Sequence, residues 1–267
     1  NTAIQTVYEP GSVFKVITMA AGIDAGAITP ETTFVDSGFL KLNGKTISNY
    51  AKKAYGKITM RGVIENSVNT GSAFAERTMG HEVFLKYVQA FGIGNKTGIA
   101  LPGEVKGSLK SLTGPRRDIN FATASFGQGI SMTPLSLITA ISAIANNGVL
   151  MRPFIRANVK PEIVRTVVGK KAAEAVTSMM VSAVEKAGVA KIPGYQVAGK
   201  TGTAQIPDFK KGGYTDSFIH TYAGFAPASY PRFAILFKLD QPEGAPLAGG
   251  TVVPAFRELA QFMLNYY

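Results

Sequence analysis

Three short strings, widely spaced along the chain, contain the residue types that acyl transfer to a serine requires. They are Ser12-Val13-Phe14-Lys15, Ser67-Val68-Asn69 and Lys200-Thr201-Gly202-Thr203. Together they supply a hydroxyl nucleophile, an amine base, and donors for an oxyanion and a carboxylate. Any one string alone is a weak signal, whereas the three in this order indicate acyl-transfer chemistry.

The first string places a nucleophile and a base on one helical face. Ser12 and Lys15 are three residues apart at the expected start of a helix, so their side chains lie on the same side. A neutral amine can accept the serine proton, which requires that burial and a nearby cation lower the pKa of Lys15. Lys200 is the candidate for that cation. The alternative for so common a tetrapeptide is an ordinary surface helix.

The second string lies between two expected helices, where a polar loop is also the ordinary alternative. The hydroxyl of Ser67 is suited to relay a proton to a leaving amine. The amide of Asn69 is suited to hold Lys15 and a substrate carbonyl.

The third string lies in a segment with the composition of a β-strand. A glycine inside a strand is typical of a close backbone approach, so Gly202 would let an extended peptide dock along the strand edge. Lys200 with Thr201 or Thr203 would receive a substrate carboxylate, and the N–H of Thr203 would complete an oxyanion hole. The alternative is a glycine bulge in an ordinary strand.

Composition excludes several other chemistries. The chain has 267 residues, of which 46% are hydrophobic and 17% charged, as in globular proteins. It contains no cysteine, which excludes thiol catalysis, disulfides and Cys-ligated metals. His81 and His220 are its two histidines and lie far apart in sequence, so a Ser-His-Asp triad or a His-rich metal site is not expected. A lysine is therefore the expected base.

The basic residues are numerous but scattered. The net charge is +11, yet no basic run with interleaved aromatic residues occurs, so we expect a solvated basic face and no nucleic-acid partner. No apolar stretch is long enough to span a membrane. No charged-then-apolar leader opens the chain, so any signal or anchor is expected to have been removed.

Hydrophobic periodicity predicts helices first and strands later, which indicates an α+β fold. The expected helices cover Ser12 to Ala25, Thr59 to Asn66, Gly71 to Thr78, His81 to Phe91, Pro134 to Asn147, Lys170 to Lys186 and Val253 to Tyr267. The expected antiparallel strands cover Tyr195 to Gln205, His220 to Ala226 and Phe233 to Leu239.

A competing motif overlaps the third string. Residues Gly194 to Thr201 match G-x-x-x-x-G-K-[ST], the phosphate loop of nucleotide hydrolases. That loop must follow a buried strand and open a helix. Residues 190–193 are too short and too broken for the strand, and Gly202, Pro207 and Asp208 forbid an immediate helix. We interpret the match as a coincidence.

The sequence around the three strings resembles the transpeptidase domain of class B penicillin-binding proteins, the monofunctional enzymes that cross-link peptidoglycan. The resemblance runs over nearly the whole chain. The strings that carry it are E-P-G-S-V-F-K at 9–15, F-G-Q-G-I-S with T-P at 126–134, V-A-G-K-T-G-T-A-Q at 197–205, and G-G-T-V-V-P with Phe256 at 249–256.

The resemblance implies a serine acyl-enzyme mechanism. Ser12 would attack the D-Ala-D-Ala bond of a stem peptide with Lys15 as its base. Ser67 and Asn69 would serve proton transfer and positioning. The terminal carboxylate would be held by the residues of the third string, which are Lys200, Thr201, Gly202 and Thr203. An amine from a neighbouring stem would resolve the ester.

The same resemblance implies partners and a location. β-Lactams would acylate Ser12 as substrate mimics, and neither a metal nor an organic cofactor is implied. The expected site of action is the extracytoplasmic face of the bacterial cytoplasmic membrane, with an anchor absent from this chain. A glycosyltransferase and other cell-wall synthesis proteins are expected partners through parts not in this chain.

The family has an anchor, a pedestal domain and two sheet strands before its first motif, whereas Ser12 follows eleven residues here. We therefore expect a β-lactamase/transpeptidase-like domain, an antiparallel sheet flanked by helices plus a mostly helical part, without its N-terminal strands. The segment 233–239 would then be left exposed or covered by something unexpected. Residues 1–267 would form one domain, helical over about 16–187 and sheet-forming over about 188–267 together with the N-terminal segment.

Other functions remain open from the sequence. A serine β-lactamase shares the strings but needs a deacylating group, and neither a class A E-x-x-L-N segment nor a tryptophan occurs. A D,D-carboxypeptidase differs in accepting water instead of an amine. A non-catalytic β-lactam sensor would keep the same serine and lysine without turnover.

Overall fold

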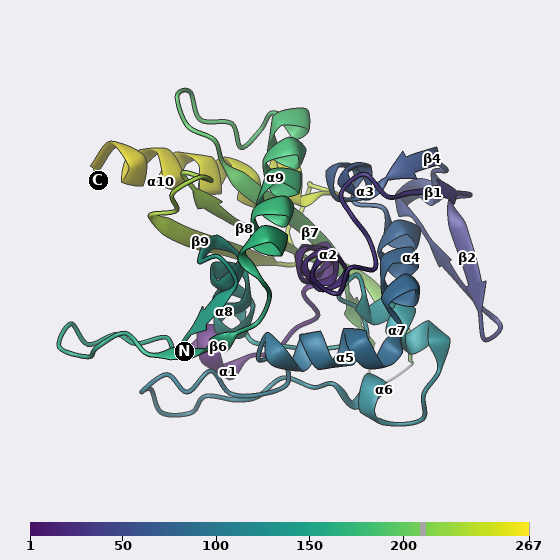
Figure 1. Ribbon diagram of the computed structural model, residues 1–267, viewed down its shortest axis with the longest axis horizontal. Helices are drawn as coiled ribbons and strands as arrows, with labels where there is room; N and C mark the ends of the chain where they lie inside the picture. Colours follow the sequence, from purple (N-terminus) through teal and green to yellow (C-terminus); the bar gives the residue numbers. More distant parts are fainter. Residues whose placement is uncertain (209–211, 267) are drawn as a thin grey trace.

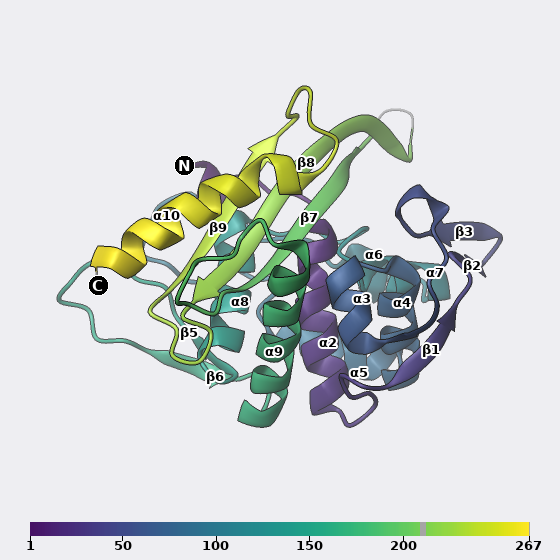
Figure 2. The ribbon, with the colours of Figure 1, turned by 90° about the horizontal axis from the view of Figure 1, so that it is seen from above.

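A three-stranded antiparallel sheet lies between two layers of helices (Figures 1 and 2). The computed structural model describes residues 1–208 and 212–266. The sheet order is β7-β8-β9, with bounds Ala198–Pro207, Tyr214–Ala226 and Phe233–Asp240. Helix α10 (Val252–Tyr266) covers one face of the sheet, and α8 (Pro134–Ala145) lies on the other.

Successive residues of β8 alternate between two cores. Tyr222 packs against Phe256 of α10, with ring centroids 4.6 Å apart. Its neighbours Ala223 and Phe225 join the larger core on the opposite face. Because the side chains of a strand point to alternate faces, β8 is buried on both sides and must be apolar throughout this stretch.

Helix α2 (Lys15–Asp24) runs through the centre of the larger core (Figure 2). Val16, Ile17 and Met19 are fully buried, as expected for a helix that is apolar all round. A 3-10 turn, η1 (Gly11–Phe14), leads into it. The surrounding helices are α3 (Met60–Asn66), α4 (Asn69–Met79), α5 (His81–Ala90) and α9 (Lys170–Ala187).

Shorter elements complete the described chain. The short helices are α1 (Thr2–Gln5), α6 (Lys110–Thr113) and α7 (Asp118–Ala124), with 3-10 turns η2 (Tyr50–Lys52) and η3 (Ala248–Gly250). Three small antiparallel pairs join β1 (Thr33–Asp36) to β4 (Gly56–Thr59), β2 (Phe39–Leu42) to β3 (Lys45–Ser48), and β5 (Val149–Met151) to β6 (Ile163–Thr166).

The predicted α+β class is confirmed, and each expected helix and strand is present with small shifts at its ends. The largest shift is in β8, which begins at Tyr214 instead of His220. The three small pairs were missed, although Asn43-Gly44 between β2 and β3 is a strong hairpin signal with positive φ at both residues. Tyr267, the expected end of the last helix, lies outside the described residues. The division into a helical and a sheet-forming part stays a prediction.

The sheet has three strands in the described part of the chain, as expected for a sheet without its N-terminal strands. The outer edge of β9 pairs with no other strand among these residues. Both faces of β9 are covered by α8 and α10, and Leu239 near its end is 42% exposed. The segment 233–239 is thus half-buried, with an open backbone edge. Within the same residues no helix is long and apolar enough to cross a membrane.

Phe256 should be essential for the attachment of α10 to the sheet. Its ring is fully buried against Tyr222. Phe256→Ala should lower the free energy of unfolding by about 3–5 kcal/mol because it removes a buried aromatic side chain and leaves a cavity. Phe262 lies on the same helix and is 65% exposed, so Phe262→Ala should change stability by no more than about 0.5 kcal/mol. Urea denaturation of both variants tests this, and equal losses would contradict it.

Candidate active site

Ser12 and Lys15 form a hydrogen-bonded pair where η1 leads into α2. Ser12 lies in the 3-10 turn and Lys15 is the first residue of the helix. Side chains three residues apart in a 3-10 turn eclipse one another, which brings Nζ of Lys15 to 2.9 Å from Oγ of Ser12. Lys15 is fully buried.

The amine of Lys15 is held by two oxygen atoms that can only accept hydrogen bonds. Its Nζ donates to the backbone O of Ser67 at 2.6 Å and to Oδ1 of Asn69 at 2.7 Å. A neutral amine has two N–H groups and one lone pair. Because both N–H groups are used by these acceptors, the lone pair is left for a hydroxyl hydrogen, and Ser12 is within reach to donate it.

Burial is the main reason that Lys15 can act as a neutral base. It removes the ammonium form from water, and this lowers the pKa of Lys15 well below its usual range. The nearby charge of Lys200 lowers the same pKa further. Both effects were expected from the sequence.

Ser67 links the second string to both lysines through a strained backbone. It ends α3 with φ of 56° and ψ of 44°, in the left-handed region that a residue with a Cβ enters at a cost of about 1 kcal/mol or more. The turn reverses the chain between α3 and α4 and directs the Ser67 carbonyl to Lys15. Its Oγ lies 3.2 Å from Nζ of Lys15 and 3.0 Å from Nζ of Lys200.

Lys200 is the second buried amine of the site. It is 3% exposed, and Nζ also donates to the backbone O of Thr201 at 3.0 Å. Burial lowers the pKa of Lys200 to about 7. Lys200 therefore changes its charge near neutral pH, while the hydroxyl of Ser67 connects it to Lys15.

Gly202 allows β7 to lie directly on the turn that carries Ser12. A Cβ at this position would be 2.9 Å from the backbone O of Pro10 and 3.1 Å from Cγ2 of Val13. The close approach predicted for this glycine is therefore to the Ser12 turn. Docking of a peptide along the strand edge, and an oxyanion role for the N–H of Thr203, stay predictions.

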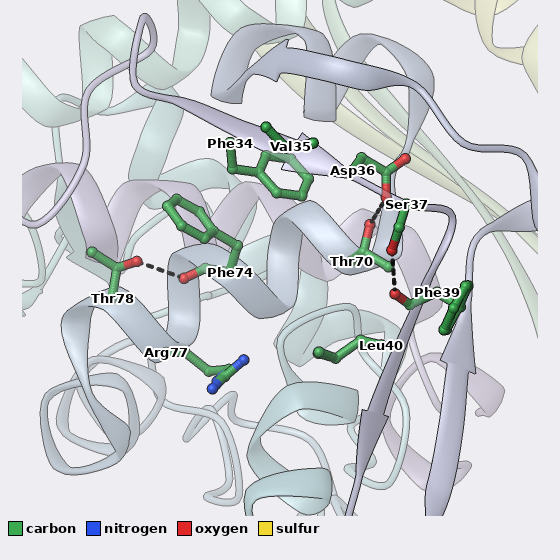
Figure 3. A pocket seen from close by; sticks show the side chains of 10 residues that line it. All are labelled: Phe34, Val35, Asp36, Ser37, Phe39, Leu40, Thr70, Phe74, Arg77 and Thr78. Atoms are coloured by element: carbon green, nitrogen blue, oxygen red, sulfur yellow. Dashed lines mark hydrogen bonds between the residues drawn. The ribbon is translucent and has the colours of Figure 1, made fainter.

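Asn69 is oriented by a buried network that the sequence did not reveal. Its Nδ2 donates to the backbone O of Ser48 at 2.9 Å, which leaves Oδ1 for Lys15. The adjacent Asn49 donates to buried Asp36 at 2.8 Å. Thr70 donates to the same carboxylate at 2.6 Å, as Figure 3 shows. The carboxylate of Asp36, far from Asn69 in sequence, thus connects β1 and the loop after β3 to the start of α4 through hydrogen bonds. A cavity of about 470 Å³ lies beside this network.

The segment after α7 supports the Ser12 turn from another side. The N–H of Gly11 donates to the O of Gly127 at 3.1 Å, and a Cβ on Gly127 would lie 2.3 Å from the O of Gly11. The ring of Phe126 lies 5.9 Å from Nζ of Lys15. The resemblance included this segment, whereas reasoning from residue chemistry gave no reason to select it.

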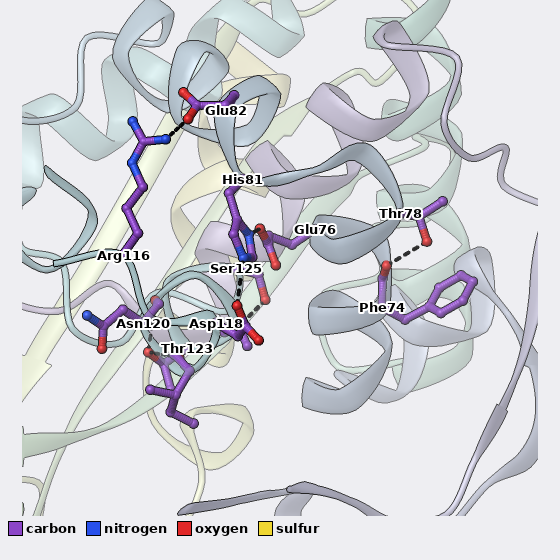
Figure 4. A network of polar contacts seen from close by, with 12 residues as sticks. Phe74, Glu76, Thr78, His81, Glu82, Arg116, Asp118, Asn120, Thr123 and Ser125 are labelled. Carbon is purple, nitrogen blue, oxygen red and sulfur yellow. Dashed lines mark hydrogen bonds and ion pairs between the residues drawn. The ribbon is translucent and has the colours of Figure 1, made fainter. Parts of the chain in front are cut away.

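His81 packs against an aromatic ring and also makes polar contacts (Figure 4). Its ring stacks on Phe121 at 4.2 Å and lies between Glu76 at 2.6 Å and Asp118 at 3.2 Å. These contacts join α4, α5 and α7. The carboxylates raise the pKa of His81 against the opposing effect of burial.

The structure brings the three strings together. A chain of hydrogen bonds joins Ser12, Lys15, Ser67, Asn69, Lys200 and Thr201. Thr203 lies two residues further along β7, and its Oγ1 accepts a hydrogen bond from the N–H of Ala248 at 3.2 Å. The nucleotide interpretation fails, because β7 continues through Lys200 and Thr201 and no helix begins there.

The chain belongs to the penicillin-binding protein transpeptidase domain family, whose model matches residues 1–261. The helices and antiparallel sheet are those of the β-lactamase/transpeptidase fold found in its structural neighbours. The family predicted from the sequence strings is thereby confirmed.

Two curated relatives are similar over nearly the whole chain. It is 35% identical to stage V sporulation protein D of Bacillus subtilis over 94% of this chain and 41% of that protein. It is 33% identical to the peptidoglycan D,D-transpeptidase FtsI of Escherichia coli over 96% of this chain and 43% of that protein. The chain thus spans less than half the length of either relative.

Two solved structures superpose on the whole chain. The transpeptidase domain of Burkholderia pseudomallei penicillin-binding protein 3 has a TM-score of 0.90 and 29% identity, with 81% of that chain covered. Mycobacterium tuberculosis penicillin-binding protein 3, complexed with aztreonam, has a TM-score of 0.88 and 31% identity, with 64% of that chain covered.

Lys200 should make stability depend on pH in the alkaline range. Its pKa is about 7 in the folded chain, whereas an unfolded lysine titrates at about 10.4. Between these values the unfolded chain binds a proton that the folded chain lacks, so the free energy of unfolding should rise with pH. Lys200→Met should flatten that rise in urea titrations between pH 7 and about 10. An unchanged slope would contradict a depressed pKa.

Proposed function

We propose that this domain is a serine-type peptidoglycan D,D-transpeptidase with Ser12 as its nucleophile. The observation that carries the proposal is the 2.9 Å contact between Oγ of Ser12 and the amine of Lys15, whose N–H groups are used by the Ser67 carbonyl and Asn69. The name of the Escherichia coli relative supports the cross-linking reaction.

Acylation begins with the proton of the Ser12 hydroxyl. The lone pair of Lys15 takes this proton as Oγ attacks the carbonyl carbon between the two D-alanines of a stem peptide. A C–O bond forms, and the carbonyl oxygen becomes an oxyanion. We assign the N–H groups of Ser12 and Thr203 to that oxyanion.

Ser67 is placed to return the proton. Its Oγ lies 3.2 Å from Nζ of Lys15, which now carries the additional proton. Proton transfer through this hydroxyl to the amide nitrogen lets the C–N bond break, and the terminal D-alanine leaves as an amine. Asn69 keeps Lys15 in place during both steps.

The third string accounts for recognition of a substrate that ends in a carboxylate. Lys200 supplies positive charge below its pKa of about 7, and Thr201 and Thr203 supply hydroxyl groups that are partly exposed on β7. Desolvation makes such contacts stronger than they would be in water. We therefore assign the carboxylate to these three side chains and the backbone at Gly202.

The second half-reaction transfers the acyl group to an amine. An amino group from a neighbouring stem peptide attacks the ester, its proton passes to Lys15, and Oγ of Ser12 leaves and regains a hydrogen. A β-lactam enters the first half-reaction, but its cleaved amide stays attached through the opened ring. The aztreonam complex of the Mycobacterium tuberculosis neighbour supports β-lactam binding.

The proposal extends to the protein that contains this domain. The relatives are cell-wall proteins, so we place the domain outside the cytoplasmic membrane, on an anchored protein that works with a glycosyltransferase. Stem peptides are its substrates, and the reaction requires no cofactor.

Intact-protein mass spectrometry after brief exposure to benzylpenicillin tests the nucleophile. The wild-type domain should gain one drug mass and keep it, because no side chain is assigned to activate a deacylating water. Ser12→Ala should gain nothing. An adduct that persists in Ser12→Ala would contradict the assignment of the nucleophile.

The same time course separates the alternative functions. An adduct that disappears while the drug is consumed would identify a β-lactamase. Incubation with a D-Ala-D-Ala donor peptide and an acceptor amine then distinguishes the rest. Amide product supports a transpeptidase, hydrolysis alone a D,D-carboxypeptidase, and neither product a sensor.

A further inference from the structure

His220 is a fully buried polar residue on the strand next to the third string. It is 0% exposed and directly opposite Thr203 in the β7–β8 register. Side chains that are opposite one another in antiparallel strands lie on the same face of the sheet. The sequence assigned this histidine no part in the chemistry, so its neighbours in the structure give new information.

A chain of hydrogen bonds runs from His220 to Thr203 through η3. Nδ1 of His220 lies 2.9 Å from Oγ1 of Thr251. The Thr251 hydroxyl is 3.4 Å from the O of Ala248, and the Thr251 N–H donates to the same oxygen at 3.2 Å. The N–H of Ala248 in turn donates to Oγ1 of Thr203 at 3.2 Å.

One tautomer of His220, with its hydrogen on Nδ1, lets every contact in this series be a hydrogen bond. Thr251 then accepts from Nδ1–H of His220 and uses its own hydroxyl hydrogen for the O of Ala248, which can only accept. Nε2 of His220 has no hydrogen-bond partner among the described residues, as expected for a neutral ring whose hydrogen is on Nδ1. A protonated ring would carry a second N–H, at Nε2, with no acceptor among the described residues. Burying an unpaired donor costs free energy, so the neutral ring is favoured.

The contact from the N–H of Ala248 matters for Thr203. Because its Oγ1 already accepts from a backbone N–H, the rotation of the hydroxyl is restricted and its own hydrogen points elsewhere. Within residues 1–208 and 212–266 that hydrogen has no acceptor, and the residue is partly exposed. Thr203 is thus set to donate to an incoming acceptor.

We propose that His220 is a positioning residue for carboxylate recognition, acting through Thr251 and the backbone of Ala248 to fix the hydroxyl of Thr203. The inference rests on the proposed function, because it gives the substrate carboxylate as the acceptor. His220 itself touches no reacting atom. It holds η3 against β7, and η3 sets the donor direction of Thr203.

Comparison of benzylpenicillin with its methyl ester isolates the contribution of the carboxylate to acylation. The measured quantity is the ratio of the two second-order acylation rate constants at Ser12. Thr251→Val keeps the shape of the side chain but loses the hydroxyl, so the acid/ester ratio should fall about tenfold, the lower end of the value of one hydrogen bond to a charged group. Thr251→Ser keeps the hydroxyl and should hold the ratio within about twofold of wild type.

A matched pair of variants at His220 tests the other end of this series of hydrogen bonds. His220→Asn keeps an N–H donor near the position of Nδ1 and should retain the ratio. His220→Gln moves the amide away from Thr251 and should lower the ratio as Thr251→Val does. In Thr203→Val, which lacks the hydroxyl, the further change Thr251→Val should have no effect on the ratio.

Equal loss with the acid and the ester, additive losses in the double variant, or an unchanged ratio in folded Thr251→Val and His220→Gln would each overturn the inference. If the wild-type domain forms no adduct at Ser12, the proposed function fails and the inference fails with it. If the wild type is acylated and only the ratio fails to respond, the proposed function stands and the inference alone is wrong.

Discussion

The desolvation of one amine is the constraint on which the rest of the structure depends. Lys15 opens the most buried helix of the molecule, and an ammonium there would lack the water that stabilises it. The fold therefore provides two neutral oxygen acceptors, from Ser67 and Asn69, and within residues 1–208 and 212–266 the amine contacts no carboxylate. A carboxylate would stabilise the charged form and remove the base. The strained turn at Ser67 and the buried support behind Asn69 follow from the need to hold those acceptors.

Two amines in one site constrain each other. Lys15 and Lys200 share the hydroxyl of Ser67, and each lies where burial disfavours its charge. Protonation of either makes protonation of the other more costly. A substrate carboxylate beside Lys200 would favour its charged form and leave Lys15 as the neutral partner. Under the proposed function, substrate binding and base activation would thus be one electrostatic arrangement, joined by the Ser67 hydroxyl that contacts both lysines.

Much of this site could be predicted from the sequence, because local spacing encodes it. The pair Ser12 and Lys15 needs only one turn of helix, and Gly202 is unusual enough within a strand to indicate a close approach. The residues that support the site could not be predicted, since the main hydrogen bonds among them join residues far apart in the chain. Nothing around Asp36 or His220 marks either residue as polar and buried. Only the folded arrangement places Asp36 against Thr70, and His220 opposite Thr203.

The most direct test of this account is the protonation state of Lys15, measured by NMR of the domain labelled with ¹⁵N at the lysine side chains. The Nζ signal of Lys15 is assigned by its loss in Lys15→Arg. We predict a titration midpoint well below the ordinary value of about 10.4, because the amine is buried beside Lys200. A signal that stays in the ammonium form up to pH 9 would contradict the account, because Ser12 would then have no base beside it.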